Sequence, residues 1–251
     1  MPSGDETVVL HGTAVASLVQ AVGALASAGL GRYAIVGGIA VMGRLGQAHR
    51  ATIDVDTVVD ETAPPDAVEA LLRQPGATVD PTNERRLLMA RTKIEILGVG
   101  PVNEEELAGI PDNDALFVAA HAWALDTATP LTLVAGDIRV GAPVAGPAAL
   151  VAMKLHAIED RSAWGRDKRA GDAWDIYRLL LDRDAGGEIR LSFAAASTTL
   201  QVLVARATDR VLVRSAARTR SWLAAGDASM AAVTVDELRF VGERLLTSLA
   251  H

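Results

Sequence analysis

The sequence predicts an α/β fold followed by a helical C-terminal lobe, and three observations support this prediction. In the first 142 residues, short apolar runs of strand length alternate with helix-length patterns. From residue 147 onward, apolar residues recur almost only at helical spacing. The chain has 251 residues, of which 50% are hydrophobic, and this is enough for two lobes. We therefore expect an α/β domain at residues 1–142 and a helical domain at residues 143–251.

Within the first domain, apolar periodicity and turn residues delimit the expected elements. They are a helix at 13–28, a strand at 33–36, a short helix, a strand at 50–59, a helix at 64–72, strands at 86–90 and 92–97, and a hairpin of 131–134 with 138–140. Gly29 and Gly31 end the first helix. Pro64-Pro65-Asp66 opens the third helix, because proline suits a first helical turn and aspartate suits its positive end.

The second domain is expected to consist of helices. Helical runs cover 148–160, 171–181, 193–207 and 235–249. The last run follows the sequence Thr234-Val-Asp-Glu237, which predicts a capping box.

The segment from Arg50 to Asp56 carries the most informative pattern of the chain. Because side chains alternate along a strand, Arg50, Thr52, Asp54 and Asp56 would share one face, and Ala51, Ile53 and Val55 the other. Alternate residues lie about 6.5–7 Å apart, so both carboxylates can lean toward one hard cation or a two-metal site. The alternatives are a solvated strand face or a pair with Arg50.

Gly37 and Gly38 lie where the strand at 33–36 is expected to pass into a helix. Glycines in this position let backbone N–H groups approach an anion at the positive end of the helix. A tight turn that requires positive φ explains the same pair. A phosphate cradle followed by paired carboxylates suits Mg²⁺-dependent nucleotidyl transfer.

Composition narrows the class of protein further. The chain has no cysteine, which excludes disulfides, thiolate catalysis and cysteine zinc sites. The net charge of −7 gives no global sign of nucleic-acid binding. The acidic start argues against a secretory signal, and the alanine- and glycine-rich run at 14–30 is a poor membrane span. We expect a cytoplasmic protein without membrane contact.

Two sets of motifs resemble those of one family. Gly37-Gly38-Ile-Ala-Val41, followed by Arg50-x-Thr52-x-Asp54-x-Asp56, resembles the opening motifs of nucleotidyltransferases related to the AbiEii abortive-infection toxin, which include the MenT-type toxins. Lys154-Leu-His-Ala157, Arg161 and the run 172–180 resemble the later motifs of that family. The first motif is shared by many polymerase β-like transferases, whereas the combination is far more selective.

The resemblance implies a fold, a reaction and partners. It implies a nucleotidyltransferase-like mixed sheet flanked by helices, an NTP substrate, and Mg²⁺ with Mn²⁺ as the alternative cation. For some members the reaction is transfer of nucleotides to the 3′ end of tRNA, and the toxin role implies an antitoxin partner. Asp54 and Asp56 would bind the metal and act in catalysis. Phosphate would be bound by Gly37, Gly38, Arg50, Thr52 and Lys154.

Lys154 and Asp172 are the expected contributions of the helical domain to the site. Lys154 lies among apolar neighbours, so it either contacts phosphate or forms a buried ion pair. Asp172 and Asp175 are one helical turn apart, so one of them can face Lys154. The resemblance favours Asp172 as the acid nearest the chemistry. Asp175 could instead pair with Arg161 or Arg178.

Three further groups have open interpretations. Glu95 is either a third metal ligand or base, or an exposed acid paired with Arg91 or Lys93. His156 is read as a satisfied histidine rather than a base. Arginines and lysines in two stretches are either RNA contacts or solvated side chains. They are Arg161, Arg166, Lys168 and Arg169 in the first stretch, and Arg206, Arg210, Arg214, Arg218 and Arg220 in the second.

The functional hypothesis is a nucleotidyltransferase toxin that acts on RNA. The alternatives are transfer to a small molecule such as an aminoglycoside or to a protein hydroxyl, and a transferase-like module without chemistry. The adjacent like charges of Asp54 and Asp56 argue against the last, because a non-catalytic descendant has no evident reason to keep them.

Overall fold

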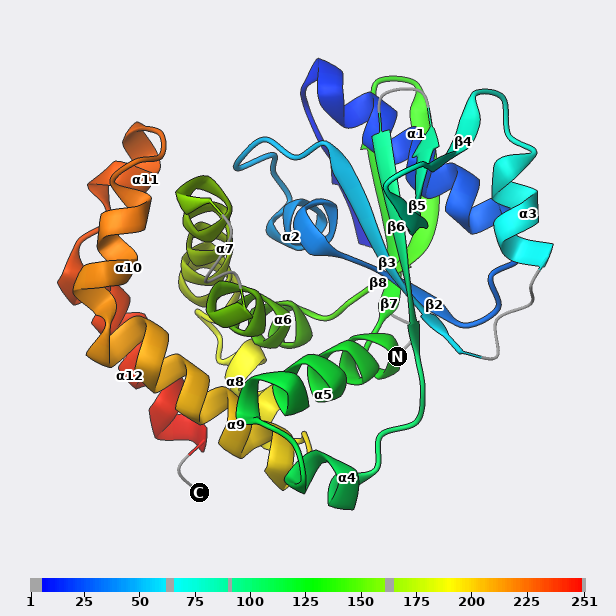
Figure 1. The fold of residues 1–251 in the computed structure, drawn as a ribbon. Coiled ribbons are helices and arrows are strands. Elements are labelled where there is room, and N and C mark those ends of the chain that lie inside the picture. Colours follow the sequence, from blue (N-terminus) through cyan, green and yellow to red (C-terminus); the bar gives the residue numbers. More distant parts are fainter. Residues whose placement is uncertain (1–5, 62–65, 90–91, 161–164, 250–251) are drawn as a thin grey trace. The chain divides into compact units, whose positions relative to one another are not determined.

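The computed structural model describes residues 6–61, 66–89, 92–160 and 165–249, and the chain divides into two compact units. The first unit comprises Met1–Pro101 and Ala122–Gly146, and the second comprises Val102–His121 and Pro147–His251. An eight-stranded mixed sheet lies in the first unit, and the second unit is built from helices (Figure 1). The predicted α/β fold with a helical end is thus confirmed, while the boundary at 142/143 stays a prediction.

The sheet of the first unit has eight strands in the order β1-β7-β8-β2-β3-β6-β5-β4. Their bounds are β1 (Glu6–Val9), β2 (Tyr33–Val36), β3 (Asp54–Asp60), β4 (Ala77–Asp80), β5 (Asn83–Met89), β6 (Thr92–Val99), β7 (Thr129–Ala135) and β8 (Ile138–Val144). The pairs β1–β7, β2–β8 and β3–β6 are parallel, and the other pairs are antiparallel. Strand β3 therefore lies inside the sheet, between β2 and β6.

Helices α1 (Thr13–Ser27), α2 (Gly37–Leu45) and α3 (Asp66–Leu72) pack beside this sheet (Figure 1). Helix α2 packs against β2 and β3, and its residues from Gly38 to Arg44 are buried. The Arg44 guanidinium is satisfied by main-chain carbonyls, with Nε donating to Ala145 O at 2.9 Å. The Arg44 bonds anchor the last turn of α2, while Gly37 places its first turn against Asp56 of β3.

The predicted strand at 50–59 is partly wrong. Strand β3 begins at Asp54, so Arg50 and Thr52 lie in the preceding irregular segment. Ala51 and Ile53 are exposed and do not pack on the core, whereas Val55 is fully buried. The ladder with β2 ends at the pair of Val36 with Asp56, because the chain turns into α2 at that point. The upstream residues thus have no strand of β2 to pair with.

Helices and two π-helical segments form the second unit. They are α4 (Glu104–Ala108), α5 (Asp112–Asp126), α6 (Pro147–Asp160), α7 (Arg166–Arg178), η2 (Leu179–Arg183), α8 (Glu188–Ala194), α9 (Thr198–Thr208), η3 (Asp209–Arg214), α10 (Ala216–Leu223), α11 (Ala228–Ala232) and α12 (Val235–Leu249). The last residues of α5 belong to the first unit. Helix α6 packs on α7, and α12 packs on α8, α9 and α10. None of the helices in the described ranges has the length and apolar character that a membrane span needs.

The expected capping box of α12 is present. Thr234 N donates to a Glu237 carboxylate oxygen at 2.7 Å, and Glu237 N donates to Thr234 Oγ1 at 3.2 Å. The predicted helix at 193–207 is wrong as a single element, since α8 ends at Ala194 and α9 begins at Thr198. Ser197 caps α9 by accepting from Leu200 N at 3.3 Å, and this cap separates the two helices.

Candidate functional site

The junction of β2 and α2 is formed by two glycines. Gly37 and Gly38 are the first residues of α2 and directly follow β2. Gly37 has a φ of +68°, a left-handed conformation that glycine adopts without strain. A Cβ atom on Gly37 would overlap with the Asp56 carboxylate. The glycine thus allows the start of α2 to lie directly against an acid of β3.

Gly38 is covered by two residues of the segment before β3. A Cβ atom on Gly38 would lie 3.0 Å from Thr52 Oγ1 and 3.1 Å from Arg50 Nη2. The N-cap residue Val36 makes no side-chain hydrogen bond to the helix. The first N–H groups of an α-helix have no partner within the helix, and its N-terminus favours negative charge. With the Arg50 guanidinium nearby, the start of α2 has the features of an anion site.

Asp54 and Asp56 lie on one face of β3, and both are half-buried. Val55 between them points to the interior and is fully buried. Thr52 Oγ1 donates to Asp54 Oδ1 at 2.7 Å, which holds the first carboxylate beside the segment over Gly38. The structure therefore brings together six residues that the sequence singles out. They are Gly37, Gly38, Arg50, Thr52, Asp54 and Asp56.

Glu95 is the register partner of Asp56 in the parallel pair of β3 and β6. Its carboxylate forms an ion pair with Arg86 on β5 at 3.0 Å, rather than with the expected Lys93. Arg91 lies outside the described residues. Hydrogen bonding to Glu95 raises the pKa of Arg86, so the guanidinium stays charged. The role of Glu95 as ligand or base stays a prediction.

The donor set of this site fits a hard divalent cation. Two carboxylates on one strand face and a threonine hydroxyl supply oxygen ligands, which Mg²⁺ prefers. Mg²⁺ usually binds through one or two carboxylates together with substrate phosphates and waters. Within the described ranges, no group of three or more acidic, histidine or cysteine side chains is placed to hold a metal. Asp54 and Asp56 thus fit a Mg²⁺ that shares its ligands with a nucleotide.

Lys154 forms a compact ion triad inside the helical unit. Its Nζ lies 2.7 Å from Asp172 Oδ1 and 3.0 Å from Asp175 Oδ2. The side chains of the two acids are 3% and 0% exposed, and that of Lys154 is 11% exposed. The expectation that one of the acids faces Lys154 thus understates the contact, because both do. The triad joins α6 to α7.

The other expected partners of Asp175 give a mixed result. Arg178 forms its ion pair with Asp182, four residues further along, with Nη2 to Oδ2 at 2.6 Å. Arg161 lies outside the described residues. The roles of Lys154, Asp172 and Asp175 toward a substrate stay predictions.

Two histidines of the helical unit pack around Phe117. His156 Nδ1 lies 3.0 Å from Asn113 O, which agrees with its interpretation as a satisfied histidine. The ring centroid of His121 lies 4.1 Å from that of Phe117. Burial lowers the pKa of His121 to about 4, and the neighbouring His156 acts in the same direction. The hydrogen bond with Phe117 O opposes this shift.

His121 is expected to make the helical unit less stable at acidic pH. The unfolded chain takes up this proton near pH 6.5 and the folded chain near pH 4, so stability is fully present above about pH 6.5 and falls between these values. The loss attributable to this group is about 3 kcal/mol across the window. Urea unfolding at pH 7.5 and 4.5 should show a smaller difference for His121→Gln than for the wild type. An equal difference, or the same reduction in exposed His11→Gln, would contradict the assignment.

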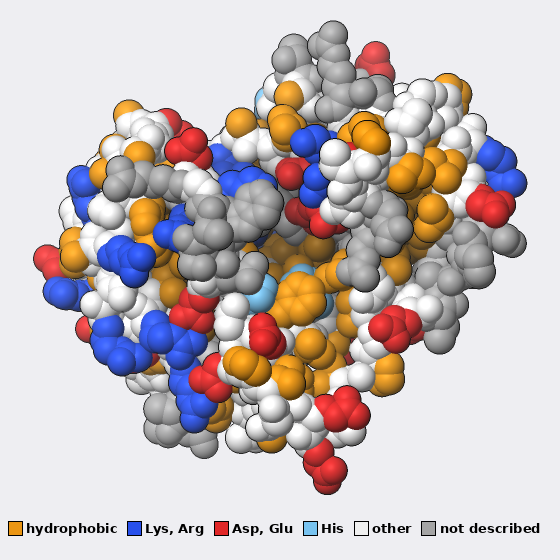
Figure 2. All heavy atoms as spheres, in the orientation of Figure 1, with side chains coloured by type: hydrophobic (Ala, Val, Ile, Leu, Met, Phe, Trp, Pro, Cys, Tyr) orange, Lys and Arg blue, Asp and Glu red, His pale blue; other side chains and the backbone are white. Residues whose placement is uncertain are grey.

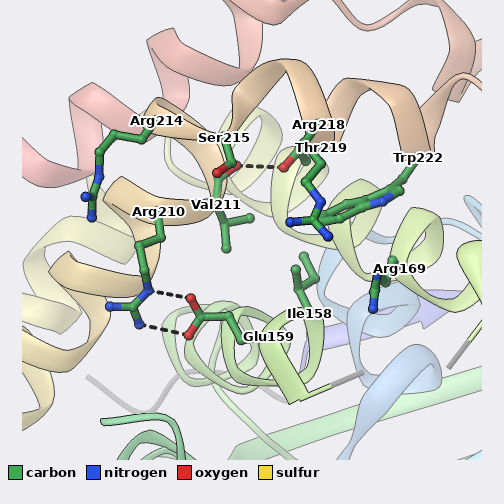
Figure 3. Close-up of a pocket in the computed structure, with 10 residues that line it drawn as sticks. All are labelled: Ile158, Glu159, Arg169, Arg210, Val211, Arg214, Ser215, Arg218, Thr219 and Trp222. Atoms are coloured by element: carbon green, nitrogen blue, oxygen red, sulfur yellow. Dashed lines mark hydrogen bonds and ion pairs between the residues drawn. The ribbon is translucent and has the colours of Figure 1, made fainter. Parts of the chain in front are cut away.

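Four arginines of the helical unit line a cavity of about 400 Å³ (Figure 3). They are Arg169 of α7, Arg210 and Arg214 of η3, and Arg218 of α10. Of the five arginines in the second predicted stretch, Arg210, Arg214 and Arg218 line this cavity. Arg206 instead pairs with Asp112 of α5 at 3.1 Å, and Arg220 donates to Ala231 O at 3.1 Å. Lys168 is exposed, and the side chain of Arg166 is not among those described.

Sequence reasoning missed two residues beside these groups. Trp222 lines the cavity. The sequence pattern that could have identified it is its four-residue spacing from Arg218, which puts both residues on one helix face. Arg86 pairs with Glu95. The sequence pattern that could have identified it is a positive charge on the predicted strand next to that of Glu95.

Comparisons with known proteins identify no family for the chain. No protein-family model matches the chain, and no curated protein matches it. One solved structure that resembles it is the crystal structure of ANT(2")-Ia in complex with adenylyl-2"-tobramycin. That likeness covers 77% of this chain and 98% of the other, with 14% sequence identity and a TM-score of 0.43. A likeness of this size carries no argument about the function of the chain.

Proposed function

We propose that the chain is a Mg²⁺-dependent nucleotidyltransferase that transfers a nucleotide from an NTP to an RNA acceptor. The proposed acceptor is the 3′ end of tRNA, and the proposed biological role is that of a toxin held in check by an antitoxin protein. The observation that carries the proposal is the contact of Gly37 with Asp56. It joins an anion-binding helix start to a strand with paired carboxylates.

Each residue of this site has a proposed task. The backbone N–H groups of Gly37 and Gly38 bind the triphosphate, and the Arg50 guanidinium adds positive charge beside them. Asp54 and Asp56 hold Mg²⁺, and Thr52 orients Asp54 through its hydrogen bond. When bound, the cation neutralises phosphate charge and activates the acceptor hydroxyl.

The proposed reaction is a substitution at the α-phosphorus of the NTP. The oxygen of the acceptor hydroxyl forms a bond to this phosphorus, and the bond to the bridging oxygen of the leaving pyrophosphate breaks. The hydroxyl proton passes to a base, for which Glu95 remains a candidate despite its pair with Arg86. The products are a nucleotidylated acceptor and pyrophosphate.

A separate part of the proposal concerns Lys154 and Asp172. They are proposed to supply phosphate neutralisation and positioning from the helical unit. Their ion triad with Asp175 already gives them a structural task. The activity of Lys154→Met/Asp172→Leu/Asp175→Leu, which removes all three charges together, separates the structural role from the role in the reaction.

Label transfer tests the proposed reaction and its acceptor. The protein is incubated with Mg²⁺ and each of the four α-³²P NTPs, with total tRNA in one set and an aminoglycoside in another. We expect label on tRNA from one NTP, and none with Asp56→Ala. Label on the aminoglycoside alone would replace the RNA acceptor by a small molecule. No label on either acceptor would count against both.

A further inference from the structure

The arginine cavity of the helical unit has two walls and an apolar floor. Arg210 and Glu159 lie on one side, and Arg218, Trp222 and Arg169 lie on the other (Figure 3). The floor between them is formed by Ile158 and Val211, which are 4% and 5% exposed. Residues of α6, α7, η3 and α10 therefore contribute to one hollow within this unit.

Trp222 holds two of the guanidinium groups in place. Arg169 Cζ lies 5.3 Å and Arg218 Cζ 5.6 Å from the centroid of the Trp222 ring, which is within cation–π distance. Stacking on an aromatic ring restrains the arginine side chain before any ligand binds. A restrained guanidinium loses less conformational entropy when it forms hydrogen bonds to an anion.

The other wall is ordered by acids. Arg210 Nη2 lies 2.8 Å from Glu159 Oε2, and Nε also donates to this carboxylate. Arg214 Nε pairs with Asp209 at 2.6 Å and remains exposed. The lining thus has four positive charges and one negative charge, a formal excess of +3. This excess stands out in a chain whose net charge is −7.

The wide turn of η3 contributes to this gathering. In an α-helix, residues four apart drift by about 40° around the axis. The wider turn of a π-helix reverses this drift over the residues from Arg210 to Arg214. The π-helical segment therefore keeps Arg210, Arg214 and Arg218 around the same hollow. Figure 2 shows further Lys and Arg side chains on the surface of this unit.

We propose that this cavity binds a phosphate group of a nucleotide, with Arg218 as the principal donor and Arg214 as a neighbouring positive charge. Arginine guanidinium groups match phosphate oxygens with paired hydrogen bonds, and the volume of about 400 Å³ admits one nucleotide. The nucleotide is part of a single-stranded RNA or is a free mononucleotide. The inference uses residues of the helical unit alone and does not depend on nucleotidyl transfer.

Binding without NTP or Mg²⁺ tests this site. In EDTA, fluorescence anisotropy with a fluorescein-labelled 12-nucleotide single-stranded RNA measures the affinity for a strand. Calorimetry with AMP measures the affinity for a free nucleotide. We expect Arg214→Gln/Arg218→Gln to weaken binding of the ligand that occupies the cavity by at least about tenfold. For RNA, the slope of log affinity against log salt concentration should become shallower by about 1.4. If the variant loses affinity for RNA alone, the ligand of the cavity is an RNA strand. If it loses affinity for AMP, the ligand is a mononucleotide.

A control variant outside the cavity and a cavity variant that keeps all the charges make the test specific. Arg239→Gln/Arg183→Gln removes the same charge from the unit at residues that do not line the cavity and that pair with exposed acids, and should change affinity less than about threefold. Trp222→Leu keeps the charge but removes the stacking, and should weaken binding by about threefold to tenfold. Thermal melts establish that each variant is folded. The proposal is overturned if neither ligand binds, or if the cavity variants and the control weaken binding equally.

Discussion

Replacing Lys154 by methionine is expected to lower the free energy of unfolding of the helical unit by about 3–5 kcal/mol. The ammonium group lies between two buried carboxylates, 2.7 Å from Asp172 and 3.0 Å from Asp175. Methionine fills a similar volume but leaves both negative charges in a medium that solvates them poorly. Breaking one side of a buried ion pair costs more than the pair itself contributes.

Urea unfolding followed by tryptophan fluorescence measures this loss, since buried Trp174 lies next to Asp175. Lys168→Met removes the same charge at an exposed position and should change stability by less than about 0.5 kcal/mol. Lys154→Met/Asp172→Leu/Asp175→Leu removes all three charges and should recover most of the stability. Equal stability of Lys154→Met and the wild type would contradict the buried triad.

The same charge-free variant separates stability from chemistry. If it folds like the wild type and transfers nucleotide at the same rate, Lys154 and Asp172 have only a structural task. A stable variant without transfer would support the proposed role of these residues in the reaction.

Asp56→Asn is expected to lower the rate of nucleotide transfer by about 10³-fold or more. Asparagine has nearly the shape of aspartate, so it preserves the packing against Gly37. It removes the negative charge that the proposed cation needs. The loss should therefore appear in the rate of transfer, while the urea midpoint changes little.

Initial rates of label transfer from α-³²P NTP measure this effect. Asp60→Asn is a matched control, because Asp60 lies on the same face of β3, about 13 Å further along. We expect Asp60→Asn to retain transfer within about threefold of the wild-type rate. Equal rates for Asp56→Asn and the wild type would remove Asp56 from the proposed metal site.

Local patterns account for the part of the fold that the sequence predicts well. The strand Tyr33–Val36, the glycines that follow it and the capping box of α12 depend on residues close together in the chain. The grouping of Asp54 and Asp56 also follows from strand alternation alone. Each of these features can be read without knowledge of a distant partner.

Features that depend on distant partners, or whose local pattern is weak, are harder to predict. Strand β3 begins at Asp54, rather than Arg50, because its ladder with β2 ends near Asp56. No helix is predicted for α5, because its alanine-rich sequence has apolar residues on most sides and little periodicity. Strand β1 pairs with β7, more than a hundred residues away, and four residues give it too little pattern to recognise.

The same distinction applies to the candidate site. The six residues around Gly37 lie within 20 positions of one another, and their spacing indicates a common location. By contrast, the pair of Glu95 with Arg86 depends on the register of β5 and β6. The arginine cavity needs side chains from four elements, which no single segment of sequence reveals.

The most direct test of the central proposal is binding of a non-hydrolysable NTP, with and without Mg²⁺. Calorimetric titration with α,β-methylene analogues of all four NTPs should find at least one that binds in Mg²⁺. The affinity should fall at least about tenfold in EDTA and equally in Asp54→Asn/Asp56→Asn. If no analogue binds, or if binding ignores both the metal and the two aspartates, the nucleotide site proposed at Gly37, Gly38, Asp54 and Asp56 is wrong.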